Sequence, residues 1–549
     1  MASSTFDPPA AGAGGKPAPA AQAPATPGAQ GTPSEKVSGR TWIAIAAGML
    51  GAFMAVLDIQ ITNSSLKDIL GTLSATQEEG SWIATAYLVA EIVVIPMTGL
   101  FTRVFGTRNY MIGTTTLFLL FSTLCGFAWN LESMIVFRMM QGFTGGALIP
   151  MAFTLVMAKL PPSKRATGMA IFGLTATLAP SMGPTLGGYL SELYGWPSIF
   201  YINWVPGLLL IAGIAYGLDK EKFQPSLLSN ADWSGIFFMA IGLGSLTIFL
   251  EEGNSKDWFD SSFIITFAAL AIFGLLGWVV NSALKKQPFV NLALYGQRNF
   301  TAATALSMAM GMGLYGSAFL LPLYLGQIPG YSPMQIGEVI MWSGLPQLFI
   351  MPFVAKLSSK VDNRILCTFG LLLFGGSCLM NSYMDATTGY DQLLVSQIVR
   401  ALGQPFVMLT LSNFAMNGIQ PKDMASASSL INMTRNLGGS IGIALLATAL
   451  TSREHFHSQR IGEAVTSFAP ATQERLAGMA ASFTSQGFDP ATASDMALKA
   501  IDGIVRRESF VMAYNDGFFL VAMVLFGCIG VLWFSDKVKA PSGGGGGGH

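Results

Sequence analysis

The chain has 549 residues, of which 51% are hydrophobic and only 11% are charged, and its 30 Lys and Arg balance its 30 Asp and Glu. Soluble domains carry about 25% charged residues, so this composition excludes an ordinary soluble protein, and the balanced charge argues against a nucleic-acid partner. It predicts a protein that crosses a membrane many times.

The two ends of the chain differ from the rest in composition. Residues 1–38 are rich in Ala, Pro and Gly, show no helical periodicity and lack the basic-then-apolar pattern of a signal peptide. We expect residues 1–41 to form a disordered cytoplasmic tail. Residues 536–549 end in PSGGGGGGH, which is typical of a run added for expression, and we expect a second cytoplasmic tail there.

Fourteen mostly apolar segments lie between the tails. Each is about 18 to 25 residues long, which is the length that a helix needs to cross a hydrocarbon core of about 30 Å. The segments are 42–64, 81–103, 109–129, 132–157, 165–191, 197–218, 233–251, 261–283, 299–325, 334–356, 364–384, 392–416, 424–451 and 509–535. The sequence therefore predicts an all-α membrane protein with 14 transmembrane helices.

Basic residues in the connections predict the orientation. One set of connections carries fourteen Lys and Arg, whereas the opposite short connections carry only Lys67 and Lys256. Positively charged loops stay in the cytoplasm, so we expect the first set and both termini to be cytoplasmic. The fourteen are Arg103, Arg108, Lys159, Lys164, Arg165, Lys220, Lys222, Lys285, Lys286, Arg298, Lys356, Lys360, Arg364 and Lys422.

One outer connection, 452–508, is long. It contains amphipathic stretches that are compatible with helices but no apolar span. Two interpretations stay open for this periplasmic loop: a solvated connector, or a docking surface for a partner protein.

Two weak repeats divide the chain into halves. PMTGLFTRVFGTR, which begins at Pro96, has a counterpart in PFVAKLSSKVDNR, which begins at Pro352, and RMMQG at Arg138 is echoed by RALGQ at Arg400. Transporters built from repeats bind substrate near the midplane between the halves. The expected parts are an N-terminal six-helix half at 42–218, two inserted helices with linkers at 219–298, and a C-terminal six-helix half at 299–535.

Charged side chains are rare in the early segments, where each costs about 2.5 to 3.5 kcal/mol. They are Asp58, Glu91 and Arg138. Glu91 stands out because no charged residue lies three or four positions from it. A carboxylate in such a place can take up a proton from one side of the membrane and release it to the other. We predict that these three residues couple transport to protons; the alternative is permanent salt bridges that only hold helices together.

Two further sets of residues are predicted from their spacing or type. Small residues four positions apart let helices approach closely, and prolines let them bend; this packing set is Gly142, Gly146, Gly183, Pro184, Gly187 and Gly188. Aromatic and amide side chains on inward faces are candidate substrate contacts, although each could equally hold helices together. They are Tyr87, Gln141, Asn203, Gln347, Gln404 and Asn413.

Metal and cofactor chemistry has little support in the sequence. His455 and His457 share one polar loop, His549 ends the chain, and the four cysteines all fall in or beside apolar segments. We find no nucleophile with a base and no phosphate-binding Gly-Lys motif, which argues against a lipid-modifying membrane enzyme. We therefore expect no metal and no cofactor.

Several motifs resemble one transporter family. LDIQITNSSL (57–66) resembles the first-span signature of the fourteen-span drug:proton antiporters, the EmrB/QacA branch of the major facilitator superfamily. Six further stretches are similar to motifs of that family, and the likeness covers residues 42–535. They are RMMQGFTGGA (138–147), APSMGPTLGG (179–188), GWPSIFYINWVPG (195–207), EEGNSKDWFDSS (251–262), LYGQRNF (294–300) and RNLGGSIGIALL (435–446). Two positions depart from the pattern: Arg103 stands where an acidic residue is usual, and Ala179 where glycine is usual.

The resemblance implies a major facilitator fold and efflux of lipophilic or cationic drugs across the bacterial inner membrane by alternating access. The proton gradient would drive it, with Asp58 and Arg138 in proton coupling; Glu91 is predicted from its burial alone. The long loop resembles EmrB-like members, which implies a periplasmic membrane-fusion adaptor and an outer-membrane channel as partners. A dedicated exporter of a siderophore or a fatty acid on the same scaffold stays open as an alternative, and a lipid-modifying enzyme is less favoured.

Overall fold

A computed structural model of the chain describes residues 37–535, apart from 230, 286–287, 359, 417, 421–422, 467 and 534. The described residues form helices and connecting loops and contain no strand, which confirms the predicted all-α class. Nearly all of both predicted tails lies outside the described residues.

The N-terminal half is built around α1, which packs against α7 and α9, while α3 packs against α5. Its helices are α1 (Gly39–Ser64), α2 (Leu66–Leu73), α3 (Gln77–Phe105), α4 (Thr107–Gly126), α5 (Leu131–Gly145), α6 (Leu148–Lys159), α7 (Pro162–Tyr194), α8 (Ser198–Tyr201) and α9 (Trp204–Gly217). Thr76 and Glu79 form a capping box that begins α3. The predicted segment 132–157 is divided into α5 and α6.

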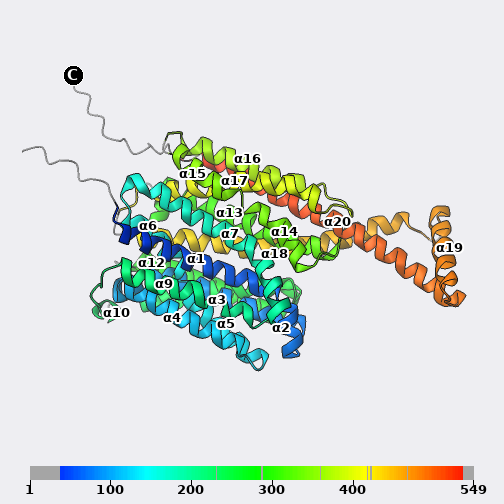
Figure 1. Ribbon diagram of the computed structural model, residues 1–549, viewed down its shortest axis with the longest axis horizontal. Helices are drawn as coiled ribbons and strands as arrows, with labels where there is room; N and C mark the ends of the chain where they lie inside the picture. The colour runs from blue at the N-terminus through cyan, green and yellow to red at the C-terminus, as the bar shows by residue number, and fades with distance from the viewer. Residues whose placement is uncertain are drawn as a thin grey trace, which may run out of the picture. The chain divides into compact units, whose positions relative to one another are not determined.

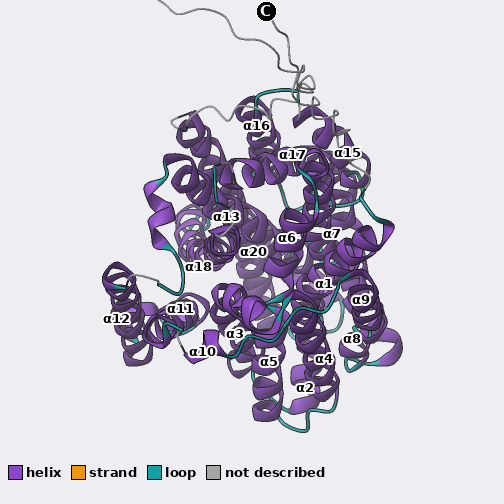
Figure 2. Cartoon of the chain, turned by 90° about the vertical axis from the view of Figure 1, so that its left-hand side faces the viewer, coloured by secondary structure: helices purple, strands orange, loops and turns teal. Residues whose placement is uncertain are grey.

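The inserted pair lies at the edge of the bundle (Figure 2), where α12 packs on α11 and α11 packs on α3 and α18. The elements of this region are α10 (Ser226–Ser229), α11 (Trp233–Gly253), η1 (Trp258–Asp260), α12 (Ser262–Leu284) and η2 (Leu292–Gly296). Exposed Ile272, Phe273 and Leu276 on α12 provide an apolar surface suited to lipid.

Asp232 joins the two inserted helices. It caps the start of α11 and accepts a hydrogen bond of 2.8 Å from Asn281 Nδ2 near the end of α12. Burial alone would raise the pKa of Asp232, but the hydrogen bonds from Asn281, from the Gly235 N–H and from Ser234 outweigh it and hold that pKa below its usual value. The carboxylate therefore stays ionised and fixes the two helix ends together.

The C-terminal half repeats the arrangement, with α13 packed against α18 and α20, and α16 packed against α17 and α20. Its elements are α13 (Arg298–Gln327), α14 (Pro333–Ile340), η3 (Met341–Ser343), α15 (Gln347–Ser358), α16 (Asn363–Asn381), α17 (Tyr390–Met416), α18 (Met424–Ala464), α19 (Pro470–Ser485) and α20 (Pro490–Trp533). The halves meet where α7 contacts α14, α15 and α17, and where α3 and α6 contact α18.

The predicted long loop 452–508 is folded into helices. α18 and α20 continue beyond the bundle, and α19 lies at their far end (Figure 1). We call residues 452–508 the helical hairpin. At its base Asp516 Oδ2 accepts a hydrogen bond of 2.5 Å from Arg453 Nε and lies 2.7 Å from His457 Nε2, which ties α18 to α20.

Eleven stretches of helix among the described residues are long and apolar enough to cross a membrane. α4, α7 and α18 occupy the other three predicted segments. Fourteen transmembrane helices therefore stays a prediction. Each of the fourteen predicted segments overlaps described helix, and 132–157, 197–218 and 334–356 are each divided between two α-helices.

Glycines mark the closest helix crossings. A Cβ added to Gly187 of α7 would lie 2.0 Å from Ser64 Oγ and 2.9 Å from the Ile61 carbonyl oxygen of α1. A Cβ added to Gly142 of α5 would lie 2.3 Å from the Tyr87 carbonyl oxygen of α3. At both crossings the two backbones touch, which is the packing role expected of small residues in a membrane.

Candidate functional site

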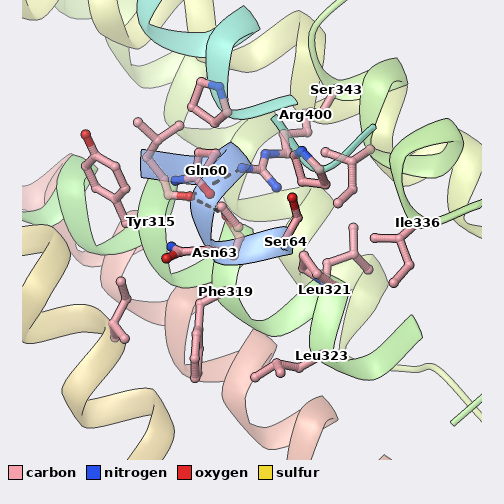
Figure 3. Close-up of a pocket in the computed structure, with 18 of the residues that line it drawn as sticks. Gln60, Asn63, Ser64, Tyr315, Phe319, Leu321, Leu323, Ile336, Ser343 and Arg400 are labelled. Carbon is pink, nitrogen blue, oxygen red and sulfur yellow. Dashed lines mark hydrogen bonds between the residues drawn. The ribbon is translucent and has the colours of Figure 1, made fainter. Parts of the chain in front are cut away.

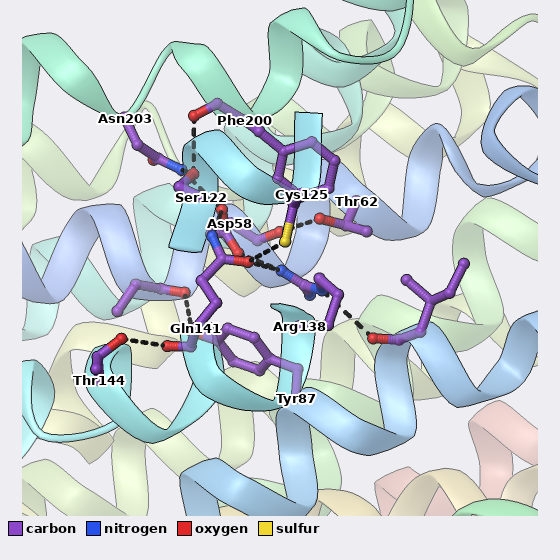
Figure 4. Close-up of polar contacts among 12 residues, drawn as sticks. Asp58, Thr62, Tyr87, Ser122, Cys125, Arg138, Gln141, Thr144, Phe200 and Asn203 are labelled. Atoms are coloured by element: carbon purple, nitrogen blue, oxygen red, sulfur yellow. Dashed lines mark hydrogen bonds and ion pairs between the residues drawn. The ribbon is translucent and has the colours of Figure 1, made fainter. Parts of the chain in front are cut away.

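Asp58 and Arg138 form an ion pair inside the N-terminal half. Arg138 Nη1 of α5 lies 2.6 Å from Asp58 Oδ2 of α1, and both side chains are almost completely buried. The pair lies among polar side chains from several helices of this half (Figure 4). A buried pair of this kind is stable only if its remaining hydrogen-bonding capacity is also satisfied.

Two amides complete the shell around the aspartate. Gln141 Nε2 and Asn203 Nδ2 donate to Asp58 Oδ1 at 2.9 and 2.8 Å, and Gln141 Oε1 accepts from Arg138 Nη1 at 2.7 Å. The Tyr87 ring centroid lies 4.4 Å from Arg138 Cζ, which is within the range of a cation–π contact. The structure thus brings predicted proton-coupling and predicted substrate-binding residues into one group, which we call the charge cluster: Asp58, Tyr87, Arg138, Gln141 and Asn203.

The charge cluster is closed. Asp58, Arg138, Gln141 and Asn203 are joined by hydrogen bonds. Tyr87 contacts Arg138 through its ring and donates its hydroxyl hydrogen bond to the Ala55 carbonyl oxygen. None of the five lines a cavity between the halves. A proton on Asp58 would remove the negative charge that holds Arg138. The geometry therefore suits either a permanent structural pair or a switch that opens when Asp58 is protonated.

A central cavity of about 420 Å³ lies between the halves (Figure 3). That volume is typical of pockets for small molecules. Its lining is mostly apolar, with polar groups from α1 and α17. The lining residues include Gln60, Asn63, Ser64, Pro180, Pro184, Tyr315, Phe319, Leu321, Ile336, Arg400 and Gln404.

A second cavity of about 220 Å³ adjoins the first and shares Gln60, Asn63 and Tyr315 with it. Glu91 of α3 lines this cavity and accepts a hydrogen bond of 3.3 Å from Asn436 Nδ2 of α18. The structure thus separates the two predicted proton carriers. Asp58 lies in the closed charge cluster, whereas Glu91 faces a cavity between the halves.

The inserted helix α11 contributes two acidic residues that sequence reasoning missed. Glu252 is fully buried and accepts hydrogen bonds of 2.9 Å from Ser81 Oγ and Thr85 Oγ1 of α3. Glu251, like Glu91, lines the second cavity; its carboxylate accepts a hydrogen bond from the Ser440 side chain, and its buried Oε1 atom has no hydrogen-bond partner. The signal was present in the sequence as two adjacent carboxylates at the end of an apolar segment.

The remaining predicted contacts lie on or near α17. Gln404 lines the central cavity, and Gln347 Nε2 donates to Gln404 Oε1 at 2.8 Å. Asn413 is not among the residues that line either cavity. Throughout the described part of the chain, no group of three or more His, Cys, Asp or Glu could hold a metal ion.

Comparison with known proteins matches residues 48–443 to the family model described as the Major Facilitator Superfamily. The colistin resistance protein EmrB of Acinetobacter baumannii is 33% identical over 91% of this chain and 97% of its own length. The fatty acid resistance protein FarB of Neisseria gonorrhoeae is 31% identical over 94% of this chain and 99% of its own length. The crystal structure of the human organic anion transporter MFSD10 (TETRAN) covers 88% of this chain and 99% of its own, with a TM-score of 0.54 and 14% identity, so this likeness concerns the fold alone.

Proposed function

The chain belongs to the Major Facilitator Superfamily, and we propose that it exports lipophilic small molecules across the bacterial inner membrane in exchange for protons. The observation that carries this proposal is the mostly apolar central cavity between the two halves, whose wall includes the helix that also bears the buried Asp58. Relatives named for resistance to colistin and to fatty acids support export over import. Family membership favours a transporter over the lipid-modifying enzyme.

In the proposed cycle α1 connects the proton site to the cavity. Asp58 faces the charge cluster, and Gln60 faces the central cavity. Protonation of Asp58 leaves the Arg138 guanidinium buried without its counter-ion, a state that costs several kcal/mol. A rearrangement of α1 that relieves this cost also moves the cavity wall, which gives alternating access.

Glu91 is the proposed second proton carrier, because it faces a cavity between the halves, where it accepts a hydrogen bond from Asn436. Each proton that moves down 100 mV provides about 2.3 kcal/mol. At about 1.4 kcal/mol per factor of ten, one proton supports a substrate gradient of between one and two orders of magnitude. The proton gradient therefore suffices as the energy source, without a cofactor.

The proposed partners are a periplasmic membrane-fusion adaptor and an outer-membrane channel. The basic connections predict cytoplasmic termini, which puts the helical hairpin in the periplasm. The hairpin extends beyond the bundle and exposes Phe468 and Phe488. An elongated helical element with exposed aromatic residues suits the docking of a protein partner.

Everted membrane vesicles test the proposed export. We expect vesicles that contain the protein to accumulate a neutral lipophilic dye when a proton gradient is imposed, and to lose it when a protonophore is added. Glu91→Gln keeps an amide oxygen for the Asn436 contact but removes the titrating group, so accumulation should fall by at least tenfold. Equal accumulation by vesicles with and without the protein would rule out the export proposal.

A further inference from the structure

Arg400 of α17 lines the central cavity without an acidic partner. It is 7% exposed, and no Asp or Glu among the described residues lies within ion-pair distance of its guanidinium. Its Nη2 makes one long hydrogen bond of 3.4 Å to the Leu314 carbonyl oxygen, and its buried Nε has none. Arg400 Cζ lies 5.5 Å from the centroid of the Phe374 ring, which stabilises the guanidinium but supplies no negative charge. A buried charge without a counter-ion is costly, so this arginine provides a site for an anion.

Gln404 presents a second free donor one helical turn further along α17. Gln347 Nε2 donates to the Ser343 carbonyl oxygen at 2.6 Å, which fixes that atom as the amide nitrogen. The same nitrogen donates to Gln404 Oε1 at 2.8 Å, so the oxygen of Gln404 points toward Gln347. The Gln404 Nε2 group is therefore left buried, at the cavity, with no acceptor.

The sequence repeat explains why Arg400 is unpaired. In the N-terminal half the arginine of RMMQG, Arg138, faces Asp58 of the first helix, α1. In the C-terminal half the arginine of RALGQ is Arg400. The first helix of that half, α13, contains no Asp or Glu. The second half has the arginine of the pair but not the carboxylate.

The rest of the central cavity suits an apolar chain. Arg400 is the one charged residue among the described residues that line it, and most of the other lining side chains are apolar or aromatic. Figure 3 shows Arg400 and Gln60 near one side of the space and Phe319 at another. The acidic residues Glu91 and Glu251 line the second cavity instead.

We propose that the central cavity binds a lipophilic carboxylate, with Arg400 and Gln404 donating to the carboxylate oxygens and the apolar wall holding the tail. This inference rests on the proposed export function and names one substrate class for it. The planar guanidinium matches a carboxylate with two parallel hydrogen bonds, and it can also bind a phosphate. An anionic phospholipid headgroup therefore shares this chemistry, and the test includes it as a separate arm.

The test measures binding to the full-length protein in nanodiscs of zwitterionic lipid, with dodecanoate and dodecanol as probes of equal chain length. Hydrogen bonds to a charged group contribute about 1.5 to 3 kcal/mol, so dodecanoate should bind about 10- to 100-fold more tightly than dodecanol. Arg400→Gln should reduce this preference to less than about threefold, because the charged donor that distinguishes a carboxylate from a hydroxyl is lost. Arg400→Lys should keep part of the preference, and Gln404→Leu should weaken it by a smaller factor.

Lys499→Gln, which removes an exposed positive charge in α20, is the matched control and should leave the preference unchanged. Equal binding of the two probes by the unmodified protein, or full preference in Arg400→Gln, would overturn the inference. Loss of the preference when phosphatidylglycerol replaces the zwitterionic lipid would also overturn it, because the site would then hold a lipid headgroup. If the protein accumulates the neutral dye but shows no preference for dodecanoate, this inference is wrong and the export proposal stands. If it binds dodecanoate through Arg400 but accumulates no dye, the export proposal is wrong and this inference stands.

Discussion

Asp58 and Gln60 lie two residues apart on α1 and face opposite sides of that helix. Asp58 pairs with Arg138 in the charge cluster, and Gln60 lines the central cavity. Two residues correspond to about 200° of rotation around a helix, which places the two side chains back to back. One helix therefore joins a buried ion pair to a cavity wall.

Asp58→Asn should abolish proton-driven accumulation of a lipophilic dye in everted vesicles. Asparagine keeps the size of the side chain but cannot carry the proton, and it leaves the charge of Arg138 without a partner in a buried site. Removal of one partner of a buried pair costs about 3 to 5 kcal/mol, so the variant should also unfold at a lower temperature. Vesicle accumulation and thermal unfolding of the purified protein measure the two effects.

A double variant separates transport from stability. In Asp58→Asn/Arg138→Met no buried charge is left unpaired, so much of the lost thermal stability should return. Transport should stay lost, since the titrating carboxylate is still missing. Accumulation restored to the unmodified level in the double variant would mean that the pair is only structural and that the proton is carried elsewhere.

The sequence was informative about individual residues and much less about their partners. Asp58, Glu91 and Arg138 stood out because a charge in an apolar segment is rare, and the repeated arginine motif made Arg400 visible. The partners depend on how distant helices cross: Asn203 reaches Asp58 from 145 residues away, and Asn436 reaches Glu91 from 345 residues away. A pattern within one segment of the sequence carries no information about contacts between residues so far apart in the chain.

The contacts of the inserted helices and the helical structure of the long loop were also missed, because neither produces a pattern of apolar residues along the chain. Segment length and hydropathy placed α11 correctly but could not indicate that Glu252 meets hydroxyl groups of α3. Residues 452–508 lack an apolar span, and apolarity was the signal used, so the continuation of α18 and α20 into a helical hairpin was not predicted. In the predicted packing set, by contrast, a Cβ added to Gly142 or Gly187 would meet the backbone of a neighbouring helix.

Gly187→Ala should destabilise the contact between α1 and α7. Its methyl group would fall 2.0 Å from Ser64 Oγ, so the helices must move apart. Overpacking of this kind costs about 1 to 3 kcal/mol, and thermal unfolding of the purified protein should show it. Gly113→Ala in α4 is the control, because no atom lies within 4 Å of the added methyl group. Equal unfolding temperatures for the two variants would contradict the close crossing.

Glu252→Ala should loosen the inserted pair from the N-terminal half. The change removes the acceptor for Thr85 Oγ1, and hydrogen bonds to a charged group contribute about 1.5 to 3 kcal/mol. Hydrogen exchange of α11 should rise. Glu251→Gln is the control one residue away: glutamine keeps an oxygen that can accept the hydrogen bond from Ser440, and Oε1 has no hydrogen bond to lose, so exchange should stay close to that of the unmodified protein. A larger effect of Glu251→Gln than of Glu252→Ala would reverse the assigned roles.

Replacement of residues 466–489 by a Gly/Ser linker of equal length should separate transport from partner docking. The linker removes α19 and the exposed Phe468 while the Arg453–Asp516 contact at the hairpin base remains. Accumulation in everted vesicles needs no adaptor and should be unchanged, whereas protection of whole cells and co-purification with a periplasmic adaptor should fall. Thermal unfolding checks that the bundle is intact. If whole-cell protection and adaptor capture both persist, the tip contributes no docking contact and the hairpin is a solvated connector. If accumulation in vesicles falls, the tip supports the bundle itself.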